Sequence, residues 1–194
     1  MTLSIIRDQI CASISVKQAI LADDKLIHQI DKLASQCFHC LKGGGKIIFA
    51  GNGGSFADAQ HLSAEFVARF ICDREPLASL VLGINSSAIS AIGNDYGYEH
   101  VFARELKGLA TPADLFIPIS TSGNSPNILV AVEQARKQGI KTAGFTGEDG
   151  GKLATLCHCL CVPSRKTATI QESHIMIGHI VCGLVERQCV NNEY

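Results

Sequence analysis

The sequence predicts an α/β fold: a three-layer sandwich with a five-stranded parallel sheet, preceded by two N-terminal helices. Three observations lead to this fold class. The first 40 or so residues carry apolar side chains at helical spacing, short apolar runs then alternate with amphipathic stretches, and 46% of the 194 residues are hydrophobic. Strands that alternate with helices build a parallel sheet that is covered on both faces. We therefore expect residues 1–194 to form a single domain with a helical extension over about residues 1–42.

Apolar residues at Ile6, Ile10 and Ile14, and again over 26–41, predict two helices that are separated near residues 23–24. Short apolar runs then predict strands over 46–50, 77–82, 114–119, 141–145 and 158–162. The helices expected between and after them are 56–70, 86–92, 126–138, a short one near 151–155, and a long one over about 170–189. In such a fold, ligands bind at the carboxyl ends of the strands.

Charge and composition exclude several classes of partner. Lys and Arg number 17 against 18 Asp and Glu, and the formal charge of −1 disfavours a nucleic-acid binder. Trp is absent and aromatic residues make up 6%, so an aromatic membrane belt is not expected. No apolar run approaches the ~18 residues that cross a bilayer, and the N-terminal segment lacks the apolar core of a signal peptide. We expect a cytoplasmic protein without membrane or nucleic-acid partners.

The nine cysteines are expected to be reduced thiols. Their number is odd and no export signal accompanies them. The dense group Cys157, Cys159 and Cys161 alternates as in a strand, without the two separated CxxC pairs of a zinc site. Buried small hydrophobes are therefore favoured over a metal site.

A glycine loop, Gly51-Asn52-Gly53-Gly54-Ser55, connects the first predicted strand to a helix. Backbone N–H groups and the helix dipole favour an anion at such a place. The loop matches neither a Walker A motif nor GxGxxG, so neither ATP nor NAD is indicated. It is either a substrate cradle or a tight turn whose glycines permit unusual backbone angles.

A second loop, residues 120–125 (STSGNS), ends the third predicted strand and is followed by Pro126. Ser125 and Pro126 suit the N-cap and the first position of a helix. Capping does not require the other three hydroxyls, of Ser120, Thr121 and Ser122. Hydroxyl donors at a helix N-terminus can hold a phosphate monoester, so we favour phosphate binding over plain capping.

Two further segments carry candidate acid-base or metal-binding residues. His61 and Glu65 are four residues apart, so they share one helix face and can address one ligand, although a surface hydrogen bond is the alternative. In the last predicted helix, Gln171 and His179 interrupt an apolar segment and need polar partners. For His174 we favour a core histidine with one hydrogen bond.

Six segments together resemble the sugar isomerase (SIS) domain family, whose fold is flavodoxin-like or Rossmann-like, over nearly the whole chain. They are GNGGS at 51–55, DAQHLSAE at 58–65, AIGNDYGYEHVFAR at 91–104, ISTSGNSPN at 119–127, TGEDGG at 146–151 and IQESHIMIGH at 170–179. Within the family, they most closely resemble the isomerases of seven-carbon sugar phosphates.

The resemblance implies conversion of sedoheptulose 7-phosphate to D-glycero-D-manno-heptose 7-phosphate, a step toward lipopolysaccharide heptose, by a homotetramer that uses no nucleotide. It implies that the phosphate is held by Ser120, Thr121, Ser122 and Ser125, and that the sugar is lined by Asn52, Gly53, Gly54, Ser55, Asn94, Asp95 and Gln171. It also implies one zinc ion per subunit, bound through His61, Glu65, Gln171 and His179.

The isomerisation passes through an enediol, which requires a base and an acid. We expect Glu65 as the base and His179 as its acid partner, while Asp95 orients a sugar hydroxyl or shares this work. Zinc bound by the same residues would polarise the carbonyl, so Glu65 can be ligand or base.

One stretch departs from the family pattern. Arg165 and Lys166 stand where the family more often has acidic or polar residues, and Thr169 where Arg is common, so the exact sugar can differ. The alternatives are a non-catalytic SIS protein that binds a replication-initiation partner, or a phosphosugar sensor. The first kind lacks acidic and histidine residues at the positions of Glu65 and His179, which favours the enzyme here.

The active site is expected to be completed across subunits. On one regular helix, Gln171 and His179 are ~12 Å apart along the axis, too far to share one metal ion easily. Either the helix begins after Gln171 or the two residues serve different sites. In the second case, we expect His179 of one chain to meet Glu65 of another.

Overall fold

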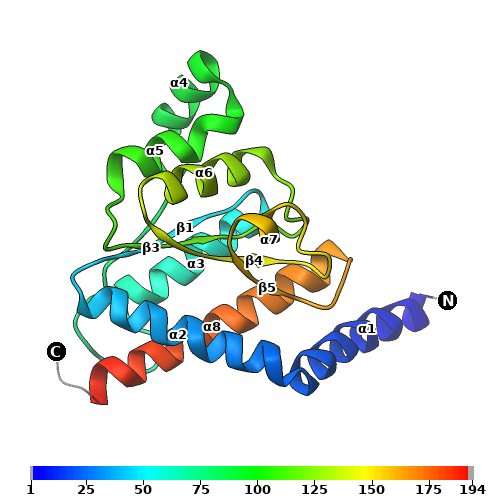
Figure 1. Ribbon diagram of the computed structural model, residues 1–194. Coiled ribbons are helices and arrows are strands. Elements are labelled where there is room, and N and C mark those ends of the chain that lie inside the picture. The colour runs from blue at the N-terminus through cyan, green and yellow to red at the C-terminus, as the bar shows by residue number, and fades with distance from the viewer. Residues whose placement is uncertain (1, 192–194) are drawn as a thin grey trace.

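The computed structural model describes residues 2–191 and is organised around a five-stranded parallel sheet (Figure 1). The strand order is β2-β1-β3-β4-β5, and every neighbouring pair is parallel. The strands are β1 (Ile47–Ala50), β2 (Ser79–Val81), β3 (Leu115–Pro118), β4 (Lys141–Thr146) and β5 (His158–Cys161). The carboxyl ends of β1, β3, β4 and β5 therefore lie along one edge of the sheet.

Helices cover both faces of the sheet. They are α1 (Thr2–Ala22), α2 (Asp24–Lys42), α3 (Gly54–Val67), α4 (Ser86–Tyr96), α5 (Val101–Leu109), α6 (Pro126–Lys137), α7 (Leu153–Leu156) and α8 (Thr167–Asn191), with a short 3-10 helix η1 (Tyr98–His100). Figure 1 shows α2, α3 and α8 on one face and α5 and α6 on the other. The fold class is thus the one that the sequence predicts, with two helices ahead of the sheet.

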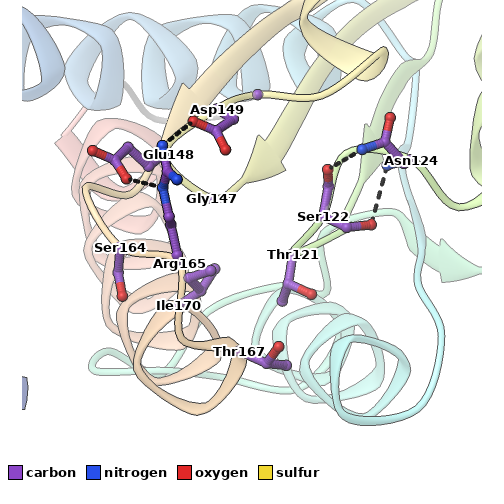
Figure 2. A pocket seen from close by; sticks show the side chains of 11 residues that line it. Thr121, Ser122, Asn124, Gly147, Glu148, Asp149, Ser164, Arg165, Thr167 and Ile170 are labelled. Carbon is purple, nitrogen blue, oxygen red and sulfur yellow. Dashed lines mark hydrogen bonds and ion pairs between the residues drawn. The ribbon is translucent and has the colours of Figure 1, made fainter.

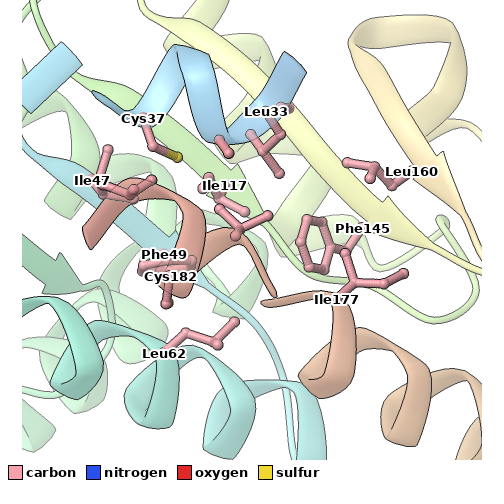
Figure 3. Packing of buried hydrophobic residues seen from close by; sticks show 14 of the residues in the cluster. Leu33, Cys37, Ile47, Phe49, Leu62, Ile117, Phe145, Leu160, Ile177 and Cys182 are labelled. Carbon is pink, nitrogen blue, oxygen red and sulfur yellow. The ribbon is translucent and has the colours of Figure 1, made fainter. Parts of the chain in front are cut away.

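Alternation along the strands supplies one hydrophobic core to each face. In β1, Ile47 and Phe49 belong to the core beneath α2, α3 and α8, whereas Ile48 and Ala50 belong to the core beneath α5 and α6. Figure 3 shows the first of these cores, where the β1 side chains meet those of α2, α3 and α8. Burial on both faces explains why the strands are continuous apolar runs rather than alternating ones.

The ends of the helices and strands differ from the predicted ones by a few residues, and the region 98–109 contains two helices that were not predicted. The second strand is shorter than predicted, Ser79–Val81 against 77–82, and α4 continues to Tyr96. The sequence analysis did not predict η1 and α5. The buried side of α5, which includes Val101, Phe102 and Leu106, has helical spacing, so the signal for this helix is present in the sequence.

The predicted helical spacing of the first segment is right, but its apolar side is not buried within the chain. Ile6, Ile10 and Ile14 are each about half exposed, and Ile20 is the residue of α1 that is buried. Figure 1 shows α1 extending away from the sheet. None of the helices between residues 2 and 191 has the length and hydropathy of a membrane span.

All nine cysteines are free thiols, as the sequence predicts. Cys159 is buried in the core beneath α6, and Cys157 and Cys161 pack against that core. The alternating group on β5 therefore acts as small hydrophobic side chains.

Candidate active site

The glycine loop after β1 is held in an unusual shape. Gly53, which precedes α3, has a φ of +54°, and a Cβ on Gly51 would collide with the backbone of Ser55. The amides of Asn52 and Asn127 exchange two hydrogen bonds of 2.9 Å, each nitrogen donating to the other's oxygen. These bonds tie the loop to the first turn of α6 and engage both polar atoms of Asn52, whose predicted sugar contact stays a prediction.

The second loop, residues 120–125, is called the serine loop here. Ser125 and Pro126 occupy the N-cap and first helical positions of α6, as predicted, but the Ser125 hydroxyl makes no capping hydrogen bond. It lies 3.1 Å from the hydroxyl of Ser120, which is buried. The start of α6 therefore keeps N–H groups that its N-cap side chain does not satisfy, which favours a ligand over capping.

Two further loops pack against the serine loop at the carboxyl edge of the sheet. A Cβ on Gly123 would collide with the backbone of Gly150, and the N–H of Gly147 donates to the carbonyl of Thr121 at 3.0 Å. The loop after β4 is joined in turn to the segment after β5, because the N–H of Glu148 donates to the Ser164 carbonyl at 3.1 Å. Loops from three successive strand ends thus pack against one another at this edge.

A cavity of about 290 Å³ opens between these loops (Figure 2). Thr121 and Ser122 line one side, and Glu148, Asp149 and Arg165 line the other. The cavity is therefore bounded by hydroxyls from the serine loop and by charged groups from the neighbouring loops.

His61, Glu65 and His179 form the second part of the site, called the His–Glu–His cluster here. Nε2 of His61 lies 3.2 Å from Oε1 of Glu65 and 3.1 Å from Nε2 of His179. Phe70 stacks on the His179 ring with centroids 5.4 Å apart. The predicted i, i+4 pair on α3 is thus joined by a side chain from α8.

Parallel packing of α3 and α8 produces this cluster. A Cβ on Gly54 would meet the Gln171 amide, and a Cβ on Gly178 would meet Leu62. Glycines therefore permit close approach at both ends of the contact, near Gln171 and again near His179.

The structure corrects the predicted division of the cluster between subunits. The helix includes Gln171, since α8 begins at Thr167, so the first of the two alternatives is wrong. Glu65 and His179 meet within one chain, so the expectation that they come from different chains is also wrong. Gln171 lies beside Gly54, ~12 Å along α8 from His179, which separates it from the cluster of its own chain.

Asn94 and Asp95 lie elsewhere on the surface. They occupy the end of α4, a helix without buried residues, and the hollow that they line shares no residue with the cavity beside the serine loop. The amide of Asn94 donates to the Asp95 carboxylate at 2.8 Å. A single chain therefore does not join them to that cavity.

His174 is a core residue, as predicted. It is fully buried, and its Nε2 lies 3.1 Å from the Thr146 carbonyl oxygen. Burial lowers the pKa of His174 to about 4, although the hydrogen bond with Thr146 opposes this shift. The histidine is therefore neutral near pH 7.

A buried ion pair, Glu186 with Arg74, supports the cluster and was not predicted from the sequence. Glu186 of α8 accepts hydrogen bonds from the backbone N–H groups of Phe70, Ile71 and Cys72 and from Nε of Arg74. Burial by itself would raise the pKa of Glu186, but these donors outweigh it and hold the pKa below its usual range. The signal in the sequence was Glu186 itself, a carboxylate that directly follows the largely apolar stretch 175–185 and therefore needs polar partners.

Asp58, one turn before His61, also has an environment that the sequence analysis did not assign. Burial raises the pKa of its half-buried carboxyl, and the nearby His61 opposes that shift. One of its carboxylate oxygens is buried without a hydrogen-bond partner in the described residues.

The His–Glu–His cluster fits a divalent metal ion. Its three ligand atoms all lie within 4.8 Å of one another, and the two imidazole nitrogens face each other. Two histidines and one carboxylate are a known ligand set of catalytic zinc, which leaves a coordination position for water or substrate. Without a metal, the N–H of one imidazole must donate a hydrogen bond to the ring nitrogen of the other, whereas a metal would accept a lone pair from each.

Comparison with known proteins agrees with this architecture. The SIS domain profile matches residues 14–147. The chain is 52% identical to the phosphoheptose isomerase of Aneurinibacillus thermoaerophilus over 97% of its length and 96% of the relative's. It is 48% identical to that of Sulfurimonas denitrificans, over 94% of each chain.

Solved structures give the same result. The phosphoheptose isomerase of Neisseria gonorrhoeae superimposes with a TM-score of 0.90 at 37% identity, over 96% of this chain and 100% of that one. The phosphoheptose isomerase of Francisella tularensis superimposes with a TM-score of 0.91 at 33% identity, over 96% of this chain and 99% of that one. The chain therefore belongs to the SIS domain family and, within it, to the phosphoheptose isomerases.

Proposed function

We propose that this isomerase converts sedoheptulose 7-phosphate to D-glycero-D-manno-heptose 7-phosphate, for heptose and lipopolysaccharide biosynthesis. The observation that carries the proposal is the His–Glu–His cluster, which places a carboxylate and an imidazole together across α3 and α8. A non-catalytic SIS protein would have no use for such a pair. The relatives named phosphoheptose isomerase support the same substrate.

Glu65 and His179 supply the acid-base chemistry. The Glu65 carboxylate takes the proton from C1 of the ketose and delivers it to C2, while His179 protonates the oxygen on C2 as the enediol forms. The hydroxyl on C1 then returns a proton to His179 as the C1 aldehyde forms, which restores both residues to their starting protonation states. About a fifth of the Glu65 side chain is exposed, so a substrate can reach it, and His61 at 3.2 Å orients the carboxylate.

The serine loop holds the phosphate. The hydroxyls of Ser120 and Ser125 meet at the start of α6, and Thr121 and Ser122 line the neighbouring cavity. All four lie at the carboxyl end of β3, where parallel sheets bind ligands. The proposed phosphate contacts are Ser120, Thr121, Ser122 and Ser125. The proposed sugar contacts are Asn52, Gly53, Gly54, Ser55, Asn94, Asp95 and Gln171.

Zinc is the proposed cofactor, one ion per subunit. His61, Glu65 and His179 would hold it; when bound it would polarise the substrate carbonyl in place of the proton from His179, and Glu65 would serve as both ligand and base. Gln171 is a candidate fourth ligand only if it comes from another subunit, because α8 keeps it away from the cluster of its own chain.

A homotetramer in the cytoplasm, built from one SIS domain over residues 1–194, completes the proposal. The half-exposed apolar residues of α1 support association, since another chain can cover them. The position of Asn94 and Asp95 outside the cavity of their own chain favours a site that two subunits complete.

The decisive experiment is turnover of sedoheptulose 7-phosphate by the purified protein and by the Glu65→Gln variant. We expect an aldose product from the wild type and a loss of ~10²-fold or more in kcat for the variant, because the amide cannot accept the proton. Glu133→Gln, an exposed change on α6, is the matched control and should keep wild-type turnover. No aldose from the wild type would refute the function, and near-normal turnover by Glu65→Gln would refute the base.

A further inference from the structure

Arg165 occupies the cavity wall opposite the serine loop. It lies in the segment between β5 and α8, and Figure 2 shows it across the cavity from Thr121 and Ser122, with its guanidinium directed along its own wall toward Glu148 and Asp149. Among the residues that line this cavity in the described chain, Arg165 is the one basic side chain. The cavity is small, at about 290 Å³, so an anion that enters it is close to both walls.

Two carboxylates hold the guanidinium at this place. Nε of Arg165 donates to Oε2 of Glu148 at 2.8 Å, and Nη2 donates to Oδ1 of Asp149 at 3.1 Å. A guanidinium has five N–H donors in a fixed plane, and Nη1 of Arg165 makes no hydrogen bond within the described residues. The side chain is 73% exposed, so these ion pairs rather than packing orient it.

The charges around the cavity favour an anion only where Arg165 offsets the two carboxylates. Glu148 and Asp149 line the same wall, whereas the serine loop contributes neutral hydroxyls. A phosphate dianion that entered without Arg165 would face two carboxylates and no cation. With Arg165, it meets a guanidinium, which matches phosphate in both charge and geometry.

We infer that Arg165 is a phosphate-binding residue that completes the serine loop site from the opposite wall. Its free Nη1 donates to the substrate phosphate, while Glu148 and Asp149 keep the guanidinium at the mouth of the cavity. This inference rests on the proposed function, since it requires the phosphate to occupy the serine loop. It also assigns a role to the stretch where the sequence departs from the family pattern.

The test is Arg165→Ala against Lys166→Ala, a neighbouring exposed cation that does not line the cavity. Both variants remove one positive charge. We expect Arg165→Ala to raise KM for sedoheptulose 7-phosphate and the inhibition constant of inorganic phosphate by about tenfold, a loss typical of one charge-assisted hydrogen bond. The kcat should be unchanged, because the phosphate is bound alike in ground and transition states, far from C1 and C2.

A triple variant separates direct binding from charge neutralisation. Arg165→Ala combined with Glu148→Gln and Asp149→Asn removes the carboxylates that the arginine neutralises. Persistently weak phosphate inhibition supports direct donation by Arg165, whereas recovery of wild-type inhibition overturns it. Equal constants for Arg165→Ala and Lys166→Ala also overturn the inference.

Ser120→Ala and Ser122→Ala distinguish this failure from failure of the phosphate site as a whole. If these serine variants weaken phosphate inhibition and Arg165→Ala does not, the serine loop site stands and Arg165 has no part in it. If none of the three changes phosphate inhibition, the phosphate lies elsewhere and the assignment of the serine loop fails as well. Thermal unfolding of each variant checks that it is folded.

Discussion

Replacement of Glu186 by Gln tests how α8 positions His179. The carboxylate is 1% exposed and accepts hydrogen bonds from three consecutive backbone N–H groups, at 3.1, 2.7 and 3.1 Å, and from Arg74. The segment that it fixes includes Phe70, whose ring stacks on His179. Gln has the same shape but carries no charge, and its NH2 group faces donors that need an acceptor.

The expected loss of stability follows from these contacts. Removing one partner of a buried ion pair costs about 3–5 kcal/mol. The guanidinium of Arg74 also donates to the carbonyls of Phe66 and Glu65, at 2.9 and 2.8 Å, so it stays partly satisfied in the variant. We therefore expect the lower end of this range, about 3 kcal/mol.

The effect should depend on pH. The pKa of Glu186 is lower in the folded protein than in the unfolded chain, where it is about 4.3. The carboxylate therefore adds to the free energy of unfolding above that pH, and this contribution is lost as the pH falls through the folded pKa. The difference in free energy of unfolding between wild type and Glu186→Gln should accordingly be largest near neutral pH and should decrease as the pH falls below ~4. A difference that is constant from pH 7 to 3 would contradict the assigned charge.

Urea unfolding at fixed protein concentration measures this difference, with the exposed Glu133→Gln as control. A loss below about 1 kcal/mol in the free energy of unfolding at pH 7 would refute the reasoning, because replacing a buried carboxylate that accepts from four donors must cost more than that. Activity at a temperature where the variant is folded then reports the position of His179. We expect kcat to fall, since the segment that supports its ring is loosened.

Three further predictions follow from the site and from α1. Ser120→Ala and Ser122→Ala should each raise KM for the sugar phosphate by about tenfold, with folding unchanged, because each removes a hydrogen bond to a charged group; unaltered KM would remove the phosphate from the serine loop. Chelation should abolish activity and zinc should restore it, and indifference to both would leave the His–Glu–His cluster without a metal role. Ile6→Ser with Ile10→Ser should produce smaller species in analytical ultracentrifugation, whereas Leu109→Ser, on exposed α5 surface, should not; an intact assembly would show that α1 is not its interface.

The architecture could be predicted from the sequence because its signals are local. The change from helical spacing to short apolar runs is repeated at each strand, and β1, β3, β4 and β5 lie where these runs indicate. The glycine and serine loops also follow from local sequence, since each stands between a buried strand and a helix. The position of His174 in the core could also be predicted, because its neighbours along the last helix are largely apolar.

Which side chains meet could not be predicted, because contacts between distant segments depend on how helices pack. His61 and His179 are 118 residues apart, and only the close parallel approach of α3 and α8 brings them within 3.1 Å. The regular spacing of α8 suggested that Glu65 and His179 belong to different chains. That inference failed because it used only the distance between Gln171 and His179 along α8. The distance from His179 to Glu65 depends on where α3 packs, which the spacing along α8 does not give.

The sequence therefore determines the sheet, the helices other than η1 and α5, and the loops at its carboxyl edge, since backbone periodicity and the positions of glycine and proline are local properties. The tertiary structure decides that Asn52 pairs with Asn127, that Glu186 ties the segment before β2 to α8, and that α1 keeps an apolar side exposed. Each of these outcomes depends on distances between elements, and residue spacing along one element carries no information about those distances.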